Sequence, residues 1–171
     1  MSDCCSVNET PPAAAEVMAC PVSGTRSKQV DLLTVRSLVR QLPFGIKLGQ
    51  YYFCDAPGCD VVYFPSHPGA PMFRRADLWV RVGAKEAEDP IPVCYCFGIT
   101  REDIWSEIHQ TGACGTAERI RAEVQAGRCA CEVKNPSGKC CLGNVTRTVQ
   151  EALRALHTPG TDKTPVARKQ S

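Results

Sequence analysis

The chain has 171 residues, a formal net charge of +2 and 43% hydrophobic residues. This length allows one domain or two small ones with a modest core. The near-neutral charge gives by itself no sign of binding to nucleic acid or to an anionic membrane surface. No apolar run approaches the about 20 residues that are needed to span a bilayer.

Twelve cysteines are many for a chain of this length. Such a number is compatible with a secreted protein held together by disulfides. The segment from Met1 to Cys5 has no basic region followed by an apolar core, so it does not resemble a signal peptide. We therefore expect a cytoplasmic protein in a reducing environment, where many cysteines favour metal binding over disulfides.

Residues 1–19 are predicted to be a flexible amino-terminal arm, because they are rich in proline and alanine and nearly lack bulky apolar residues. Residues 20–89 are predicted to be a zinc-binding β module. Within it, Thr34 is expected to cap a short helix that carries Val35, Leu38 and Val39. Residues 50–54 and 60–64 read as two paired strands rich in aromatic and β-branched residues.

Cys54 and Cys59 flank a tight turn between these two strands. A hairpin tip that presents two thiolates is typical of a zinc knuckle, and Cys20 is the natural third ligand. The alternative is that Cys54 and Cys59 only pack in the hairpin. The fourth ligand is not evident. Its candidates are Cys4, Cys5, Asp60 and His67, and Ser23 stands where a second amino-terminal cysteine would be convenient.

The end of the first module is less regular. Alternation over residues 77–82 predicts a further strand, with Trp79 in the core. Residues 85–92 are charged and end in prolines, which indicates a linker.

Residues 90–157 are predicted to be a helical module, followed by a disordered tail over residues 158–171. Thr100 and Asp103 resemble a capping box at the start of a first helix, which would bury Ile104 and Ile108. A second helix is expected from Thr116 to Gly127, with Ile120 and Val124 on its apolar side. The last helix is expected over residues 144–156, and its apolar stripe consists of Leu142, Val145, Val149, Leu153 and Leu156.

Seven cysteines cluster in this second module: Cys94, Cys96, Cys114, Cys129, Cys131, Cys140 and Cys141. A Cys-x-Cys pair suits two thiolates that one segment presents to one metal or to one edge of a cluster. The turn signature of residues 135–138 would fold the chain back, so that Cys131 and Cys141 approach one another. The following helix start favours an anionic centre. We interpret the pattern as a [2Fe–2S] site, with a tetrahedral zinc site as the chemical alternative.

These motifs, taken in order, resemble the amino-terminal domain of long-form CopZ copper chaperones. The resemblance covers about residues 20–150 and rests on residues 52–54, 59–64, 81–86, 92–96 and 135–141. It implies an α+β fold, in which a small zinc-knuckle β module precedes a helical [2Fe–2S] module like bacterioferritin-associated ferredoxin. The implied cluster ligands are Cys94, Cys96, Cys131 and Cys141, and the implied zinc ligands are Cys20, Cys54 and Cys59. The residues alone leave open Cys129 against Cys131 and Cys140 against Cys141.

The resemblance implies a metallochaperone-like protein and not an enzyme. Its [2Fe–2S] centre would supply an electron for the reduction of Cu(II) to Cu(I). The soft Cu⁺ ion would then bind transiently to thiolates, and the candidates are Cys129, Cys140, Cys114 and the Cys4–Cys5 pair. The expected partners are a copper-exporting ATPase or a separate copper-carrier domain, together with an electron donor protein. The long-form chaperones continue into a domain with a Cys-x-x-Cys motif, which this sequence lacks.

Two other functions fit the same residues. One is a ferredoxin-like electron-transfer module that docks on a larger redox enzyme, and the other is a cluster-based sensor of oxidants or iron. We find no phosphate-binding glycine loop and no nucleophile–base motif.

Overall fold

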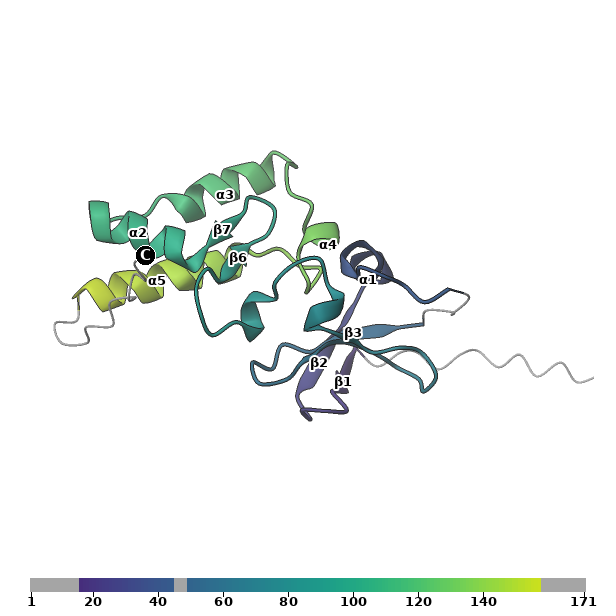
Figure 1. Cartoon of the computed structure of the whole chain (residues 1–171). Helices are drawn as coiled ribbons and strands as arrows, with labels where there is room; N and C mark the ends of the chain where they lie inside the picture. Colours follow the sequence, from purple (N-terminus) through teal and green to yellow (C-terminus); the bar gives the residue numbers. More distant parts are fainter. Residues whose placement is uncertain (1–15, 45–48, 158–171) are drawn as a thin grey trace, which may run out of the picture.

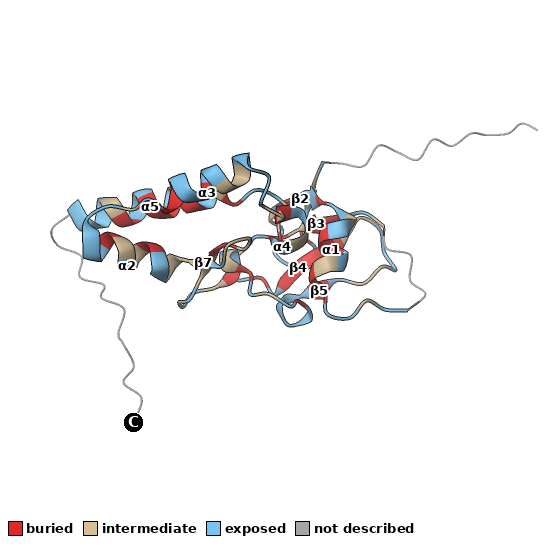
Figure 2. Ribbon diagram, turned by 90° about the horizontal axis from the view of Figure 1, so that it is seen from above, coloured by how far each residue is buried: buried red, intermediate tan, exposed pale blue. Residues whose placement is uncertain are grey.

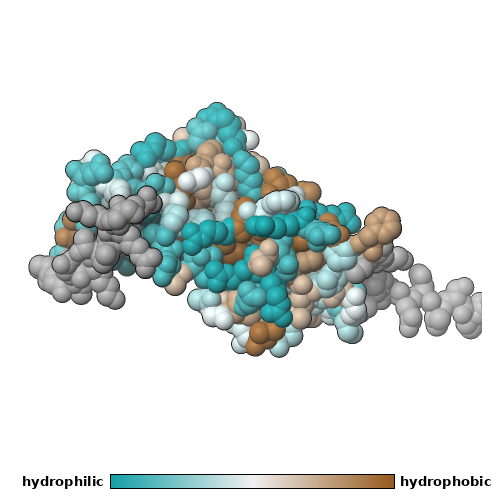
Figure 3. Space-filling view, in the orientation of Figure 1, coloured by the Kyte–Doolittle hydropathy of each residue, from teal (hydrophilic) through white to brown (hydrophobic). Residues whose placement is uncertain are grey.

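The computed structural model describes residues 16–44 and 49–157. A small antiparallel sheet forms the amino-terminal half and a group of helices forms the carboxy-terminal half, so the α+β architecture is confirmed (Figure 1). The buried residues gather along the strands and on the inner faces of the helices (Figure 2). The face seen in Figure 3 is mostly hydrophilic, with its hydrophobic side chains in separate small groups.

The sheet has five short strands, each antiparallel to the next in the order of the chain. The strands are β1 (Val17–Ala19), β2 (Arg26–Val30), β3 (Tyr51–Phe53), β4 (Val61–Pro65) and β5 (Phe73–Arg74). Because successive side chains of a strand point to opposite faces, Tyr51 packs in the core beside Val35 and Leu38, whereas Tyr52 packs in the core that contains Cys20, Cys54 and Cys59. The predicted pair of strands, β3 and β4, is confirmed.

Two predictions near the start of this half were wrong. Val17–Ala19 was assigned to the flexible arm, but it pairs with β2 as a strand, which satisfies its backbone groups; the rest of the arm lies outside the described residues. Helix α1 (Leu32–Leu38) is capped by Asp31, whose carboxylate accepts a hydrogen bond from the Leu33 N–H at 2.7 Å. Thr34 instead lies inside this helix and is buried.

The predicted strand over residues 77–82 is absent: this irregular part of the chain connects two 3-10 helices, η1 (Arg75–Asp77) and η2 (Gly83–Lys85). Leu78 forms only an isolated bridge with Val39. Trp79 was predicted to be in the core but is 64% exposed, and the Arg40 guanidinium covers its ring at 5.3 Å from the centroid.

Residues 85–92 do not form a free linker. Lys85 is buried, and the Glu86 carboxylate accepts hydrogen bonds from both Arg75 and Arg81. Further along, Asp89 pairs with Arg101 at 2.7 Å. The charged groups of Lys85, Glu86 and Asp89 therefore form ion pairs and hydrogen bonds that tie the segment to both halves.

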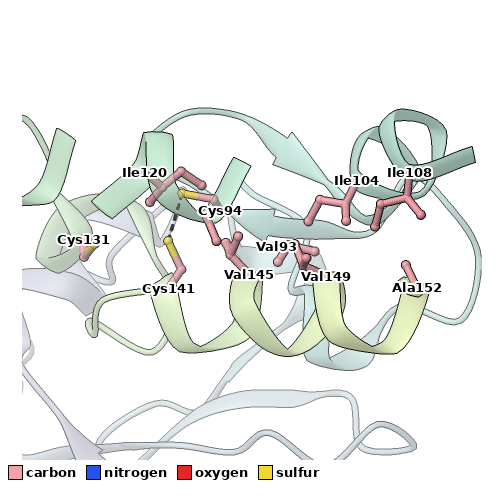
Figure 4. Close-up of a cluster of buried hydrophobic side chains, with 11 residues drawn as sticks. Val93, Cys94, Ile104, Ile108, Ile120, Cys131, Cys141, Val145, Val149 and Ala152 are labelled. Carbon is pink, nitrogen blue, oxygen red and sulfur yellow. Dashed lines mark hydrogen bonds between the residues drawn. The ribbon is translucent and has the colours of Figure 1, made fainter. Parts of the chain in front are cut away.

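The second half begins with a short hairpin of β6 (Pro92–Cys94) and β7 (Ile99–Thr100). The helices are α2 (Arg101–Thr111), α3 (Thr116–Gln125), α4 (Cys131–Lys134) and α5 (Leu142–His157). Helix α5 packs against α2 and α3. The core between them is formed by Val93, Ile104, Ile108, Ile120, Val145, Val149 and Ala152 (Figure 4).

Most local predictions for this half are confirmed. The capping box of Thr100 and Asp103 is present, and Gly127 follows the end of α3 with a φ of 69°. The last helix starts two residues earlier than predicted. Leu156 is exposed although it was assigned to the apolar stripe, and Ala152 occupies the buried position on that side of α5 instead. None of the helices in the described ranges is long and apolar enough to cross a membrane.

Candidate metal centres

The first candidate centre consists of Cys20, Cys54 and Cys59, whose Sγ atoms all lie within 4.8 Å of one another. All three side chains are buried. In the part of the chain that the structure describes, this is the only such group of three or more metal-type ligands. The structure thus brings together the three residues that were predicted to bind zinc.

Strand pairing explains why these cysteines meet. Cys20 lies in the turn between β1 and β2, and Cys54 and Cys59 lie in the turn between β3 and β4. Because β2 and β3 are antiparallel neighbours with Lys28 opposite Phe53, the start of β2 lies beside the end of β3. The two turns therefore lie at the same end of the strands. Each turn is closed by backbone hydrogen bonds, from Gly24 to Cys20 at 2.8 Å and from Cys59 to Ala56 at 3.2 Å.

Ser23 lies beside these sulfurs, and its Oγ is 3.5 Å from the Sγ of Cys54. Burial opposes ionisation of Cys20, but hydrogen bonds from the Ser23 side chain and backbone lower the pKa of this thiol to about 7. For Cys54 burial dominates and raises the pKa. One thiol is therefore readily deprotonated, as a metal ligand must be.

Among the described residues, the other two candidates for the fourth ligand, Asp60 and His67, do not join the group. The Asp60 carboxylate pairs with Arg74 at 3.3 Å. The His67 ring lies at hydrogen-bond distance from the carbonyl oxygen of Pro68, at 3.2 Å from Nδ1. Cys4 and Cys5 lie outside the described residues.

The second candidate centre consists of two sulfur pairs. The Sγ atoms of Cys94 and Cys141 are 3.0 Å apart (Figure 4), and those of Cys96 and Cys131 are 3.5 Å apart. A disulfide bond would bring the sulfurs to about 2.05 Å, and the ten cysteines of the described residues are all free thiols. Each pair joins one cysteine of the β6–β7 hairpin to a later one, which is Cys131 at the start of α4 or Cys141 directly before α5.

The turn that closes this centre is confirmed. The Gly138 N–H donates to the Asn135 carbonyl oxygen at 2.8 Å, and the Asn135 side chain donates to the Lys139 carbonyl oxygen at 2.6 Å. This turn lies between Cys131 and Cys141 and folds both toward the hairpin. The Tyr63 hydroxyl of the sheet donates to the carbonyl oxygen of Pro136 at 2.8 Å, so the first half holds the turn from outside.

The two thiols of the Cys94–Cys141 pair differ in acidity. The hydrogen bond from Cys141 lowers the pKa of Cys94 to about 6, and the pKa of Cys141 is correspondingly raised. Burial and the neighbouring Cys96 raise the pKa of Cys131 to about 12. The Ala130 N–H donates to the Cys96 sulfur at 3.3 Å. In the Cys94–Cys141 pair, a metal cation that replaces the proton between the sulfurs would hold both as thiolates.

The remaining cysteines of the second half stand apart from these pairs. Cys129 and Cys114 are half-buried and Cys140 is exposed. The Cys114 thiol donates to the Glu107 carboxylate at 3.3 Å. The structure therefore pairs Cys131 and Cys141, and not Cys129 and Cys140, with the Cys-x-Cys motif. That these residues bind metal stays a prediction.

Comparisons with known proteins find similar proteins for both halves of the chain. Residues 17–78 match the model of the CopZ family described as a zinc binding domain, a range that includes Cys20, Cys54 and Cys59. The chain is 36% identical over 132 residues to the copper chaperone CopZ of Archaeoglobus fulgidus. This alignment covers 77% of the chain and 61% of that protein. The chain thus spans about three-fifths of the length of this curated relative.

A solved structure is also similar. The X-ray structure of the Archaeoglobus fulgidus CopZ N-terminal domain aligns with a TM-score of 0.60 at 38% identity, covering 76% of this chain and 96% of that one. These two likenesses cover 77% and 76% of the chain, which is more than the amino-terminal half contains. Both therefore extend into the helical half.

Proposed function

The chain belongs to the family of the CopZ amino-terminal domain, and on this premise we propose that it is a copper-handling metallochaperone with two resident metal centres. Cys20, Cys54 and Cys59 would hold Zn²⁺, while Cys94, Cys96, Cys131 and Cys141 would hold a [2Fe–2S] cluster. The likeness to a protein described as a copper chaperone supports a metal carrier, not an enzyme.

The arrangement of the four cysteines in two sulfur pairs carries this proposal. A single tetrahedral zinc ion with bonds of about 2.3 Å would gather four sulfurs at mutual distances of about 3.8 Å. Here the partners within each pair are that close, but no three of these sulfurs lie within 4.8 Å of one another among the described residues. Two pairs held apart suit two metal ions, with two thiolates on each, as in a [2Fe–2S] cluster.

A bound [2Fe–2S] cluster supplies storage of one electron. Held by the four cysteines, the cluster would supply the one electron that converts the substrate Cu(II) to Cu(I), and an electron donor protein would restore its reduced state. Because Cu(I) is soft, it prefers thiolates. The exposed Cys140 and the half-buried Cys129 and Cys114 are the acceptors among the described residues. A copper-exporting ATPase or a carrier domain on another chain would receive the ion.

Zinc would have a structural role in the first half. The three cysteines come from two different turns, so one ion would join the β1–β2 hairpin to the β3–β4 hairpin. A small sheet with few residues per strand gains much of its stability from such a link, because metal binding free energy becomes folding free energy.

The proposal is tested with protein purified without oxygen. We expect iron, sulfide and zinc, a visible absorption band, and an electron paramagnetic resonance signal after reduction. Changing Cys141→Ser should abolish the iron signal and leave zinc in place, whereas the matched change Cys140→Ser should preserve both. Colourless wild-type protein, or a Cys140→Ser variant that loses its iron while Cys141→Ser retains it, contradicts the assignment.

Copper chemistry needs a separate measurement. Reduced protein mixed anaerobically with Cu(II) should reoxidise and yield Cu(I), which a chromophoric Cu(I) chelator detects. Combined replacement of Cys114, Cys129 and Cys140 by serine should weaken Cu(I) binding, with the Cys4–Cys5 pair as the remaining candidate acceptor, and leave electron delivery intact. If no Cu(I) forms, the protein is an electron-transfer module or a sensor instead.

A further inference from the structure

Lys85 is buried in a place where a lysine is uncommon. Its side chain is 3% exposed, although lysine is almost never fully buried without a partner. Its ammonium donates hydrogen bonds to the carbonyl oxygens of Ala56 and Cys59, both at 2.9 Å. It also lies 3.8 Å from the Sγ of Cys54. All three contacts are in the loop that carries two of the three zinc-site cysteines.

This ammonium has no carboxylate partner in an ion pair of the described residues. The adjacent Glu86 is occupied by Arg75 and Arg81. A buried charge is costly unless it is compensated. Three thiolates around one divalent cation carry one net negative charge, and the thiol nearest to Lys85 belongs to that group. The loaded metal site is therefore the natural counter-charge of Lys85.

The position of Lys85 is fixed from the other side as well. It ends the short helix η2, whose Gly83 N–H donates to the Tyr95 hydroxyl at 2.8 Å. A Cβ at Gly83 would lie 2.1 Å from the Pro92 carbonyl oxygen, so only glycine allows this close approach. Tyr95 and Pro92 belong to the hairpin that carries Cys94 and Cys96. The ammonium thus reaches the zinc loop from a backbone anchored beside the second centre.

We propose that Lys85 is a positioning residue of the three-cysteine centre: its ammonium holds the loop of residues 54–59 closed and neutralises the charge of the metal–thiolate group. The proposal rests on the zinc site described above. It predicts that zinc affinity depends on a residue that is not itself a ligand. Substitution of hydrogen-bonding partners outside the ligand set typically costs about 10- to 100-fold in metal affinity.

The experiment measures zinc affinity by competition with a chromophoric chelator under anaerobic conditions. Lys85→Met keeps the length of the side chain and removes its charge and donors, and we expect zinc to bind about 10- to 100-fold more weakly. Lys28→Met removes an exposed lysine of β2 and should leave the affinity unchanged. A folded Lys85→Met protein with wild-type affinity overturns the proposal, whereas wild-type protein that binds no zinc overturns the zinc site itself.

A measurement on the wild-type chain covers the case in which Lys85→Met does not fold. Lysine acylation, read by mass spectrometry, should modify Lys28 equally with and without zinc. Lys85 should be protected when zinc is bound and should become reactive after chelation, because the loop opens. Equal reactivity of Lys85 in both states contradicts the proposal.

Discussion

The hydroxyl of Tyr63 links the sheet to the turn of the second centre, so removing it tests whether the first half supports the second. Tyr63 is fully buried on β4, and its hydroxyl donates to the buried carbonyl oxygen of Pro136 at 2.8 Å. The change Tyr63→Phe keeps the ring, so it creates no large cavity, but it leaves this carbonyl without its donor. Such a loss costs about 1–3 kcal/mol. We expect the free energy of unfolding to fall by about 2 kcal/mol.

Tyr51→Phe is the matched control. The Tyr51 hydroxyl also donates to a proline carbonyl, that of Pro71 at 3.0 Å, but this contact is partly exposed and stays within the sheet half. Here water can replace the lost donor, so we expect a change below about 1 kcal/mol. Denaturant unfolding without oxygen measures both values.

The second readout is the rate at which iron is lost to a chelator. Tyr63→Phe should accelerate this loss, because the turn between Cys131 and Cys141 is less firmly held, whereas Tyr51→Phe should not. A Tyr63→Phe protein with wild-type stability, or equal iron loss from the two variants, would refute the reasoning.

Three further changes probe other contacts. Gly138→Ala should lower the free energy of unfolding by about 2 kcal/mol, because Gly138 has a φ of 68° and an added Cβ would lie 2.8 Å from Thr34 Oγ1; a denaturant melt equal to that of wild type contradicts this. Hydrogen bonds, above all from the Arg119 side chain, lower the pKa of Glu107 to about 2. The Glu107 carboxylate therefore stabilises the fold fully at a pH above 4.5, its ordinary pKa, and this contribution is lost as the pH falls toward 2. Glu107→Gln should cost about 1–2 kcal/mol at pH 7 after solvent screening, and thermal melts should show that its difference from wild type vanishes over this range. Ser23→Cys adds a fourth thiol beside Cys54, so zinc should bind about tenfold more tightly in chelator competition; unchanged affinity would exclude Ser23 from the coordination shell.

Several predictions that depend on neighbours along the chain were confirmed. The capping box of Thr100 and Asp103 and the hydrogen-bonded turn of residues 135–138 need only residues within a few positions of each other. The same holds for the paired strands β3 and β4, whose alternation and short connection define a hairpin. The spacing of cysteines and prolines therefore contains the local geometry of both candidate centres.

Two predictions that depend on distant partners, those for Lys85 and Trp79, failed. Lys85 was assigned to a charged linker, yet its ammonium donates to Ala56 and Cys59, which lie 29 and 26 positions earlier. Trp79 was predicted to be in the core, yet it is exposed and the Arg40 guanidinium covers its ring. Burial and ion pairing are properties of the assembled chain, and no local pattern encodes them.

The cysteines show the same division. The sequence alone determined that the carboxy-terminal half carries a Cys-x-Cys motif and two later groups of cysteines around a turn. Only the tertiary structure decided that Cys131 and Cys141, and not their neighbours Cys129 and Cys140, face Cys96 and Cys94. Residues so close in sequence differ mainly in the direction of their side chains, and that direction follows from how α4 and α5 pack on the rest of the molecule.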